Sequence, residues 1–365
     1  MEWTLYVDLD AYYVACELRD RPELEGRRVL VGPDPSKGPT RGVVLSASYA
    51  ARAFGARSAM PVTRAAELVP EAVWVAPDFA KYERTAREVR TLLRRFSDRV
   101  IPLSIDEAAV IVDLEDIAAV RRLAREIQAA IRTELRLSAS IGASPHRTVA
   151  KIASDREKPG GIVIVPPQGI AEFLASLPIR VVPGVGPKTD ARLRAIGLET
   201  LGELARRRPG ELRPVLGSFA AELVALARGH PKPLPDETGG PRSRSVDRTF
   251  PEDIGDLEPL LKALPAMAGS LAGVLQEERL VGEGVGVGVR WADFSRIQRS
   301  RASTHGIHEA EEIRAEAERL LRSAWGEERT GRGRSVRTLS VRVERLRPAS
   351  GVQRRLDGPP EAPVN

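Results

Sequence analysis

The chain has 365 residues, of which 42% are hydrophobic and 29% are charged, and its formal net charge is +6. This length allows two to four domains with their own cores, and the composition excludes global disorder. The single cysteine excludes a disulfide framework and a cysteine zinc site, and no apolar run is long enough to span a membrane. We therefore expect a cytoplasmic protein without membrane contact, whose moderate positive charge favours polyanionic partners.

The first part of the chain alternates strand-like and helix-like segments. The apolar patterns predict strands at residues 3–9, 28–31, 100–104, 109–112, 138–143 and 162–165. They predict helices at residues 11–18, 49–54, 61–68, 82–95, 117–135 and 148–155. Mixed strands crossed by two long helices are typical of an α+β core of the ferredoxin-like or palm type.

The pattern changes twice further along the chain. From residue 169 to about residue 229 it is all-helical, and a stretch rich in Pro and Gly follows, which predicts a linker. A second, smaller α+β domain is then expected, with strands at 243–250, 285–291, 295–301 and 338–346 and helices at 257–277 and 309–325. The tail from Pro348 is rich in Pro and Gly and is expected to be disordered.

Two acidic strings lie about a hundred residues apart in apolar, strand-like surroundings. Asp8 ends one predicted strand, with Asp10 close behind it, and Asp106 and Glu107 stand at the bend between two others. Buried carboxylates need a compensating charge, and a shared pair of Mg²⁺ ions would supply it and indicate phosphoryl transfer. The alternative is a set of helix-capping and turn acids on a solvated edge.

Two further groups could contact a triphosphate. Tyr49 and Arg52 are three residues apart and share a helix face, and Lys158 precedes the turn Pro159-Gly160-Gly161. The alternatives are a surface Arg beside a half-buried Tyr, and a lysine that answers a helix dipole.

Two features indicate contact with nucleic acid. The string from Pro183 to Thr189 resembles a helix-hairpin-helix turn, in which Gly184 and Gly186 leave backbone N–H groups open to a phosphate. In the C-terminal part, several arginines recur at period two and are expected on one cationic sheet face. A plain helical turn and a solvated face are the alternatives. The arginines are Arg242, Arg244, Arg248, Arg296, Arg299, Arg301, Arg332, Arg334, Arg337 and Arg342.

The motifs VDLDAYY, SASYAARAFG, SIDEA, AKIASDREKPGG and PGVGPKT, in this order, resemble a Y-family translesion DNA polymerase of the DNA polymerase IV branch. The resemblance covers residues 1 to about 347 and implies the architecture of a right hand. It implies a palm at 1–10 and 78–166, fingers at 11–77, a thumb at 167–230, a linker at 231–241, a little finger at 242–347 and a tail at 348–365.

The resemblance also implies roles for individual residues. The metal ligands would be Asp8, Asp106, Glu107 and the carbonyl of Leu9, with two Mg²⁺ ions per site. Tyr13 would be the steric gate that excludes a 2′-hydroxyl. The remaining nucleotide contacts would be Ser46, Tyr49, Arg52 and Lys158. The DNA contacts would include Gly184, Gly186, Lys188, Arg244, Arg299, Arg301, Arg334 and Arg337.

The implied activity is low-fidelity, DNA-templated addition of dNTPs to a primer, without a proofreading exonuclease. The implied partners of the chain, expected to act as a monomer, are primer-template DNA and dNTP. A clamp-binding peptide often ends chains of this family, and residues 353–356 resemble it faintly. A nucleotidyl cyclase-like palm enzyme and a non-catalytic DNA-binding protein that keeps the fold remain as alternatives.

Overall fold

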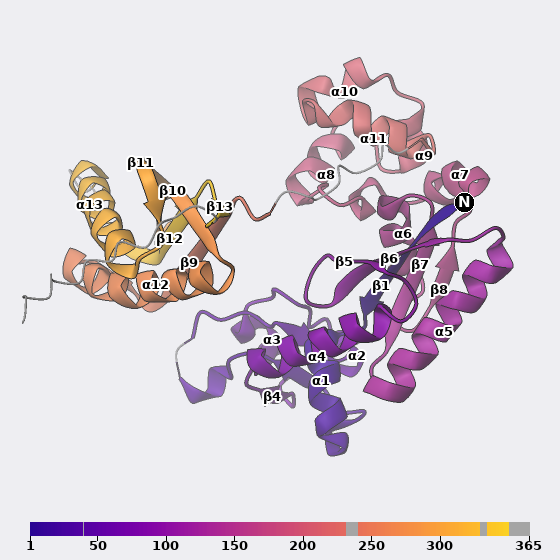
Figure 1. Ribbon diagram of the computed structural model, residues 1–365, viewed down its shortest axis with the longest axis horizontal. Helices are drawn as coiled ribbons and strands as arrows, with labels where there is room; N and C mark the ends of the chain where they lie inside the picture. Colours follow the sequence, from indigo (N-terminus) through magenta and orange to yellow (C-terminus); the bar gives the residue numbers. More distant parts are fainter. Residues whose placement is uncertain (39, 231–239, 329–333, 350–365) are drawn as a thin grey trace, which may run out of the picture. The chain divides into compact units, whose positions relative to one another are not determined.

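The computed structural model describes residues 1–38, 40–230, 240–328 and 334–349 (Figure 1). Contacts within the chain divide it into two units, residues 1–235 and 236–365. Residues 231–239 of the expected linker and residues 350–365 of the expected tail lie outside the described part.

A five-stranded sheet forms the centre of the first unit. Its strand order is β5-β6-β1-β7-β8, and β1 pairs antiparallel with both neighbours. The expected strands of this sheet are confirmed, with ends shifted by a few residues at most. Their bounds are Glu2–Leu9 (β1), Arg99–Pro102 (β5), Glu107–Asp113 (β6), Ala139–Ser144 (β7) and Ile162–Ile164 (β8).

The two faces of this sheet carry different layers because the side chains of each strand alternate. In β1, Trp3, Leu5 and Val7 join the large core formed with α4 (Phe79–Leu93) and α5 (Ile117–Leu135). Asp8 therefore points to the opposite face, which is covered by α6 (Arg147–Ser154) (Figure 1). The period-two pattern thus places a carboxylate beneath a basic helix.

Helix α6 lies unusually close to the sheet. A Cβ atom at Gly142 of β7 would lie 2.0 Å from the carbonyl oxygen of Ala150 and 2.3 Å from the backbone nitrogen of Ser154. No side chain fits there, so glycine is required for this packing. The close approach brings Lys151 of α6 within reach of the end of β1.

A smaller three-stranded sheet is formed by the part of the chain between β1 and α4. It contains β2 (Val29–Val31), β3 (Ser46–Ala47) and β4 (Val73–Val75), together with the helices α1 (Tyr12–Asp20), α2 (Tyr49–Arg52) and α3 (Val62–Leu68). The sequence did not predict β4, and β3 is only two residues long.

Glu17 ties α1 to α4 through a buried network. Its carboxylate accepts hydrogen bonds from Lys81 Nζ at 2.8 Å and from Tyr82 Oη at 2.7 Å. Burial raises the pKa of Glu17, but the hydrogen bonds from Lys81 and Tyr82 outweigh that effect and lower the pKa below its usual value. The carboxylate therefore stays charged and anchors α1, the helix that carries Tyr13.

The rest of the first unit is helical, as expected. It contains α7 (Ile170–Ala175), α8 (Pro187–Arg194), α9 (Leu201–Ala205), α10 (Pro209–Leu216) and α11 (Phe219–Ala227). These helices share a core with Val149, Ile152 and Ala153 of α6. Helix α6 thus connects the helical segment to the sheet.

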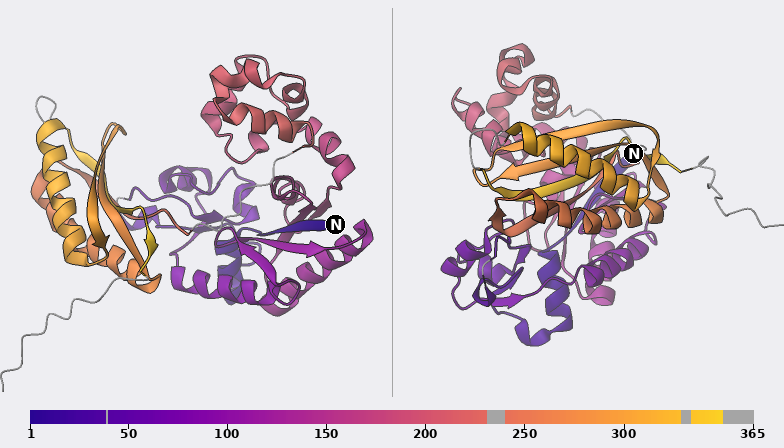
Figure 2. Two further views of the ribbon diagram at one scale, coloured as in Figure 1. Left: turned by 45° about the horizontal axis from the view of Figure 1, so that its top comes forward. Right: turned by 90° about the vertical axis from the view of Figure 1, so that its left-hand side faces the viewer.

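The second unit is a four-stranded antiparallel sheet in the order β11-β10-β12-β9, with α12 and α13 on one face (Figure 2). The expected elements are confirmed. Their bounds are Ser243–Ile254 (β9), Leu257–Glu277 (α12), Leu280–Trp291 (β10), Arg296–Ile307 (β11), Ala310–Glu328 (α13) and Val336–Glu344 (β12), and a short β13 (Arg347–Pro348) pairs with β10.

No helix among the described residues combines the length and the apolar composition that a membrane span needs.

Candidate active site

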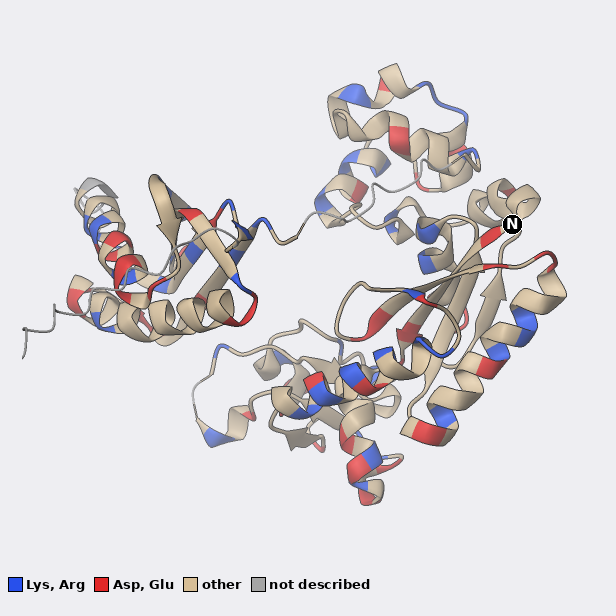
Figure 3. Ribbon diagram, in the orientation of Figure 1, with Lys and Arg blue, Asp and Glu red and all other residues tan. Residues whose placement is uncertain are grey.

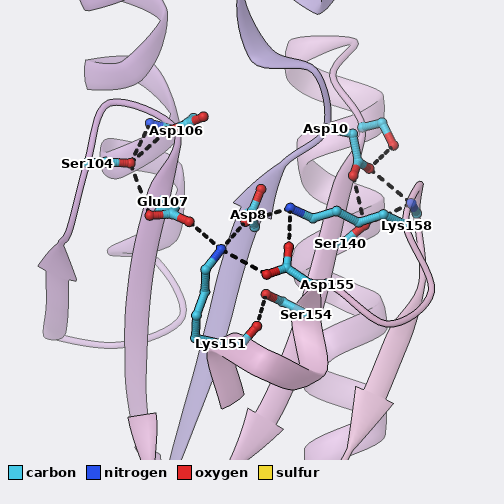
Figure 4. Close-up of polar contacts among 12 residues, drawn as sticks. Asp8, Asp10, Ser104, Asp106, Glu107, Ser140, Lys151, Ser154, Asp155 and Lys158 are labelled. Carbon is cyan, nitrogen blue, oxygen red and sulfur yellow. Dashed lines mark hydrogen bonds and ion pairs between the residues drawn. The ribbon is translucent and has the colours of Figure 1, made fainter. Parts of the chain in front are cut away.

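Strand pairing brings the two acidic strings together. Asp8 lies directly opposite Glu107 in the β1–β6 register, so their side chains share one face of the sheet (Figure 4). The backbone N–H of Leu9 donates to the carbonyl of Asp106 at 2.9 Å and fixes the bend that carries the second string. Two carboxylates a hundred residues apart in sequence therefore become neighbours.

Lys151 of α6 lies between these carboxylates. Its Nζ is 2.9 Å from Asp8 Oδ2 and 2.5 Å from Glu107 Oε1 (Figure 4). The side chain of Asp8 is only 6% exposed, so this ammonium group compensates a charge that water cannot reach. No role for Lys151 follows from the sequence alone, since its i,i+4 spacing to Asp155 is that of an ordinary pair on a helix surface.

A second lysine reaches the same carboxylate oxygen. Lys158 Nζ is 2.7 Å from Asp8 Oδ2 and 2.7 Å from Asp155 Oδ1. Asp155 Oδ2 in turn lies 3.3 Å from Lys151 Nζ. Three carboxylates and two ammonium groups thus form one cluster, whose net charge is one negative.

This cluster holds its lysines in the charged form. Burial lowers the pKa of Lys151, but Asp8 and Glu107 raise it well above its usual value. Burial likewise lowers the pKa of Lys158, and Asp8 and Asp155 raise it. Burial raises the pKa of Asp8, while the two ammonium groups counteract that rise.

Asp106, the third expected metal ligand, has a different partner. Ser104 Oγ donates to its Oδ1 at 2.6 Å, and the bend places its side chain beside Glu107 without a lysine contact (Figure 4). Within the described residues, no three acidic, histidine or cysteine side chains are arranged so that they could hold a metal ion directly.

The donor set nevertheless fits a divalent cation in its chemistry. Mg²⁺ prefers carboxylate and carbonyl oxygens, and Asp8, Asp106 and Glu107 provide carboxylates on adjoining backbone segments. The gap between Asp8 and Glu107 already attracts a cation, the ammonium group of Lys151. A metal ion bound there would therefore neutralise the same two carboxylates that the ammonium group of Lys151 neutralises in this structure.

Asp10 does not belong to this cluster. It is 3% exposed, and its carboxylate accepts hydrogen bonds from Ser138 Oγ at 2.7 Å, Ser140 Oγ at 2.8 Å and the N–H of Gly160 at 2.9 Å. Gly160 lies in the same turn as Lys158. Asp10 thus has a structural role, since it fixes the turn from which Lys158 reaches Asp8.

Tyr13 packs within an aromatic group on α1 and α4. Its ring centroid is 4.7 Å from that of Tyr82, 5.6 Å from that of Tyr12 and 6.3 Å from that of Phe79. Burial raises the pKa of Tyr13, with a smaller contribution from Asp106. The ring is therefore half-buried, neutral and held in place near the carboxylates.

Tyr49 and Arg52 share one face of α2, as their spacing predicted. The guanidinium of Arg52 lies 4.8 Å from the Tyr49 ring centroid, and its Nε donates to the Ala47 carbonyl at 3.0 Å. The phenol of Tyr49 lies 3.5 Å from Asp10 Oδ1. Burial, together with Asp10, raises the pKa of Tyr49 to about 12. Ser46, in contrast, is buried in β3.

Comparison with known proteins adds independent evidence. The impB/mucB/samB family model matches residues 7–155, its C-terminal domain model matches residues 241–356, and the helix-hairpin-helix motif of the same family matches residues 167–198. DNA polymerase IV of Methanoculleus marisnigri is 38% identical over 343 residues, which cover 94% of both chains. DNA polymerase IV of Alkalilimnicola ehrlichii is 38% identical over 346 residues, with the same coverage.

The chain belongs to the Y-family of DNA polymerases. Its relatives place it in the DNA polymerase IV branch, whose activity is DNA-templated translesion synthesis. Solved structures agree: a chimera of the Y-family polymerases Dbh and Dpo4 has a TM-score of 0.85 at 25% identity, covering 95% of this chain and 99% of the chimera. The DinB structure from Sulfolobus solfataricus has a TM-score of 0.63 at 25% identity, covering 94% and 98%. A cyclase-like palm enzyme is thereby excluded.

The helix-hairpin-helix turn of the polymerase lies at the start of α8. Gly184 has φ +91°, a left-handed value that favours glycine, and Gly186 caps α8. A Cβ atom at Gly186 would meet nothing within 4 Å, so nothing inside the protein requires a glycine there. Lys188 lies in the first turn of α8.

The arginines of the polymerase's C-terminal sheet lie on both of its faces, whereas the sequence predicted that they share one face. Arg299 and Arg301 pair with Val287 and Val285, whose side chains are buried under the helices, and Arg244 pairs with Val343. Paired residues share a face, so these three arginines lie on the helix-covered side, at the two edge strands.

The prediction of one shared cationic face is therefore wrong, because Arg299 and Arg301 lie on the face opposite to Arg296 and Arg342. Period two identifies residues that share a face, but it does not tell which face the helices cover. Arg244 also forms two hydrogen bonds with Glu278 of the helical layer, at 2.9 and 2.7 Å. Arg337 packs 4.7 Å from the ring of Phe294, near the turn that joins β10 and β11, and Arg334 lies 3.7 Å from Asp293 in that turn.

Proposed function

We propose that this chain extends a primer 3′-hydroxyl by one deoxynucleotide at a time in a reaction that depends on two Mg²⁺ ions. The observation that carries the proposal is the pairing of Asp8 with Glu107 on one sheet face, next to Asp106 and under two lysines. A buried site that attracts this much cationic charge suits a reaction between a nucleotide triphosphate and a hydroxyl.

The metal ligands in this proposal are Asp8, Asp106, Glu107 and the carbonyl of Leu9. When bound, the two ions lower the pKa of the primer hydroxyl and neutralise charge on the triphosphate and the leaving pyrophosphate. The chain's own part is to hold its carboxylates at fixed positions, which the β1–β6 pairing and the Leu9–Asp106 hydrogen bond do.

The triphosphate contacts in this proposal are Tyr49, Arg52 and Lys158, with Ser46 close by. Lys158 supports the proposal because it stays charged and lies within 2.7 Å of a proposed metal ligand. Tyr49 contributes a neutral donor, since its raised pKa keeps the phenol protonated. Together they offer the positive field that a transferring phosphoryl group needs.

The proposed fidelity is low. Val43, a fingers residue expected over the nascent base pair, is 40% exposed, and Ala59 is its small neighbour in the proposal. The proposal includes no proofreading exonuclease. All proposed catalytic residues come from one chain, so a monomer suffices. The faint clamp-binding resemblance at 353–356 lies outside the described residues.

Replacement of Asp106 tests the metal assignment. Asp106→Ala removes one proposed ligand, and primer extension should fall to less than a few per cent of the wild-type rate, because ligand loss removes much of the charge stabilisation. Asp98→Ala, an exposed acid nearby in sequence, serves as the control. Substantial extension by Asp106→Ala would refute the assignment. A wild-type protein that incorporates no dNTP would revive the non-catalytic alternative.

Replacement of Tyr13 tests the steric gate. Tyr13→Ala opens space beside the sugar, so incorporation of ribonucleotides relative to deoxyribonucleotides should rise at least tenfold, roughly the discrimination that one shape contact provides. Single-nucleotide insertion kinetics with matched rNTP and dNTP measure the ratio. Phe54→Ala, which removes an exposed aromatic ring that packs on Arg28, is the control, and an unchanged ratio for Tyr13→Ala would reject the gate.

For the C-terminal sheet, we propose DNA contact on the face opposite to its helices. Register places Arg296, Arg290 and Arg342 on that face, around the small residues Gly286 and Gly288. The glycines place no side chain between the arginines, and the arginines supply charge for a phosphate backbone. This replaces the helix-side arginines as the proposed principal contacts.

A salt titration of DNA binding tests which face of the C-terminal sheet contacts DNA. Arg296→Ala should weaken primer-template binding and reduce the slope of log affinity against log salt by about one, because one phosphate contact is lost. Arg244→Ala is the matched control, since its guanidinium already pairs with Glu278. An equal change of slope in both variants, or a change in Arg244→Ala alone, would contradict the proposed face.

A further inference from the structure

Asp155 is the acid directly after the last residue of α6, and both lysines of the cluster contact it. Its Oδ1 is 2.7 Å from Lys158 Nζ, and its Oδ2 is 3.3 Å from Lys151 Nζ (Figure 4). Its side chain is 48% exposed, whereas that of Asp8 is 6% exposed. Asp155 is therefore the more accessible of two carboxylates that share the same pair of cations.

The helix itself gives no reason for an acid at this position. The C-terminus of a helix carries a partial negative charge, so a carboxylate there is unfavourable by itself. Asp155 is the C-cap of α6. The two lysines are the compensation that the structure provides for it, which indicates a role connected with Lys151 and Lys158.

The contacts of Asp8 indicate that Asp155 becomes important when a metal ion binds at Asp8. Lys151 and Lys158 both bind the same oxygen, Asp8 Oδ2. An oxygen with two ammonium partners has little capacity left for a divalent ion, and two ammonium groups beside the carboxylate repel such an ion. Metal binding at Asp8 therefore favours a state in which at least one lysine has given up its contact. A displaced ammonium group still needs a carboxylate partner, because it lies in a half-buried site.

We propose that Asp155 is a positioning residue that retains Lys151 and Lys158 when metal ions take over Asp8, and so presents Lys158 to the incoming triphosphate. The proposal rests on the proposed function, in which Asp8 is a metal ligand and Lys158 contacts the triphosphate. Asp155 itself touches neither substrate nor metal. Its two oxygens already hold one lysine each, so the transfer requires no rearrangement of the backbone.

The spacing along the chain supports this mechanism. Lys151 lies four residues before Asp155 and Lys158 three residues after it, so one carboxylate serves a helix residue and a turn residue together. Asp10 fixes the far side of that turn through the N–H of Gly160. The position of Lys158 is thus set from both sides, by a buried acid through the backbone and by Asp155 through the side chain.

The test compares Asp155→Asn with Glu157→Gln, an exposed acid two residues further on. Three quantities are measured on primer-template DNA: the Kd of dNTP with Ca²⁺ and a dideoxy-terminated primer, and the KM and kcat of single-nucleotide insertion with Mg²⁺. Asp155→Asn should raise Kd and KM about tenfold, as expected for one charge-assisted contact, and change kcat less. Glu157→Gln should change none of them, and Asp155→Glu should restore most of the loss.

Each other result overturns the inference. If Asp155→Asn has the Kd and KM of Glu157→Gln, or only a lower Tm, Asp155 has a structural role alone. Lys158→Ala separates this inference from the function on which it rests. A raised Kd in Lys158→Ala with an unchanged Kd in Asp155→Asn refutes the inference only, whereas an unchanged Kd in Lys158→Ala refutes the triphosphate role of Lys158 as well. If Asp155→Asn fails to fold, Asp155→Ser carries the same expectation.

Discussion

The charge balance at the end of β1 is the constraint on which the site depends. Asp8 is almost fully buried, so its carboxylate must have cationic partners at all times. Lys151 and Lys158 provide them, and each reaches Asp8 only because of a separate backbone feature. Gly142 lets α6 approach the sheet, and Asp10 holds the turn that follows Lys158.

The sequence predicted the carboxylates of this site better than its lysine contacts. Asp8 and Glu107 were predictable because each ends or begins an apolar strand, and neighbouring strands bring such ends together. Lys158 was predictable from the Pro-Gly-Gly turn and the family resemblance. Lys151 and Asp155 were not, because on a helix they look like an ordinary i,i+4 surface pair. Only the packing of α6 against Gly142 turns that pair toward Asp8.

The elements of the fold also differ in how well the sequence predicts them. The helices α5 and α12 were predicted with their observed bounds, because each has an acid just before its first residue and a long amphipathic pattern. Strands of two or three residues, such as β3 and β4, are too short to show a period. The arginines were expected on one face and lie on both, because an odd spacing along a strand, such as that from Arg296 to Arg299, changes the face.

The most direct test of this account is a crystal structure of the protein with primer-template DNA, a non-incorporable dNTP and Ca²⁺. We expect cations about 2.3–2.6 Å from carboxylate oxygens of Asp8 and its neighbours, with Lys158 moved from Asp8 to the triphosphate while it keeps its contact with Asp155. A bound dNTP with both lysines still on Asp8 Oδ2, and no cation at that carboxylate, would contradict the account.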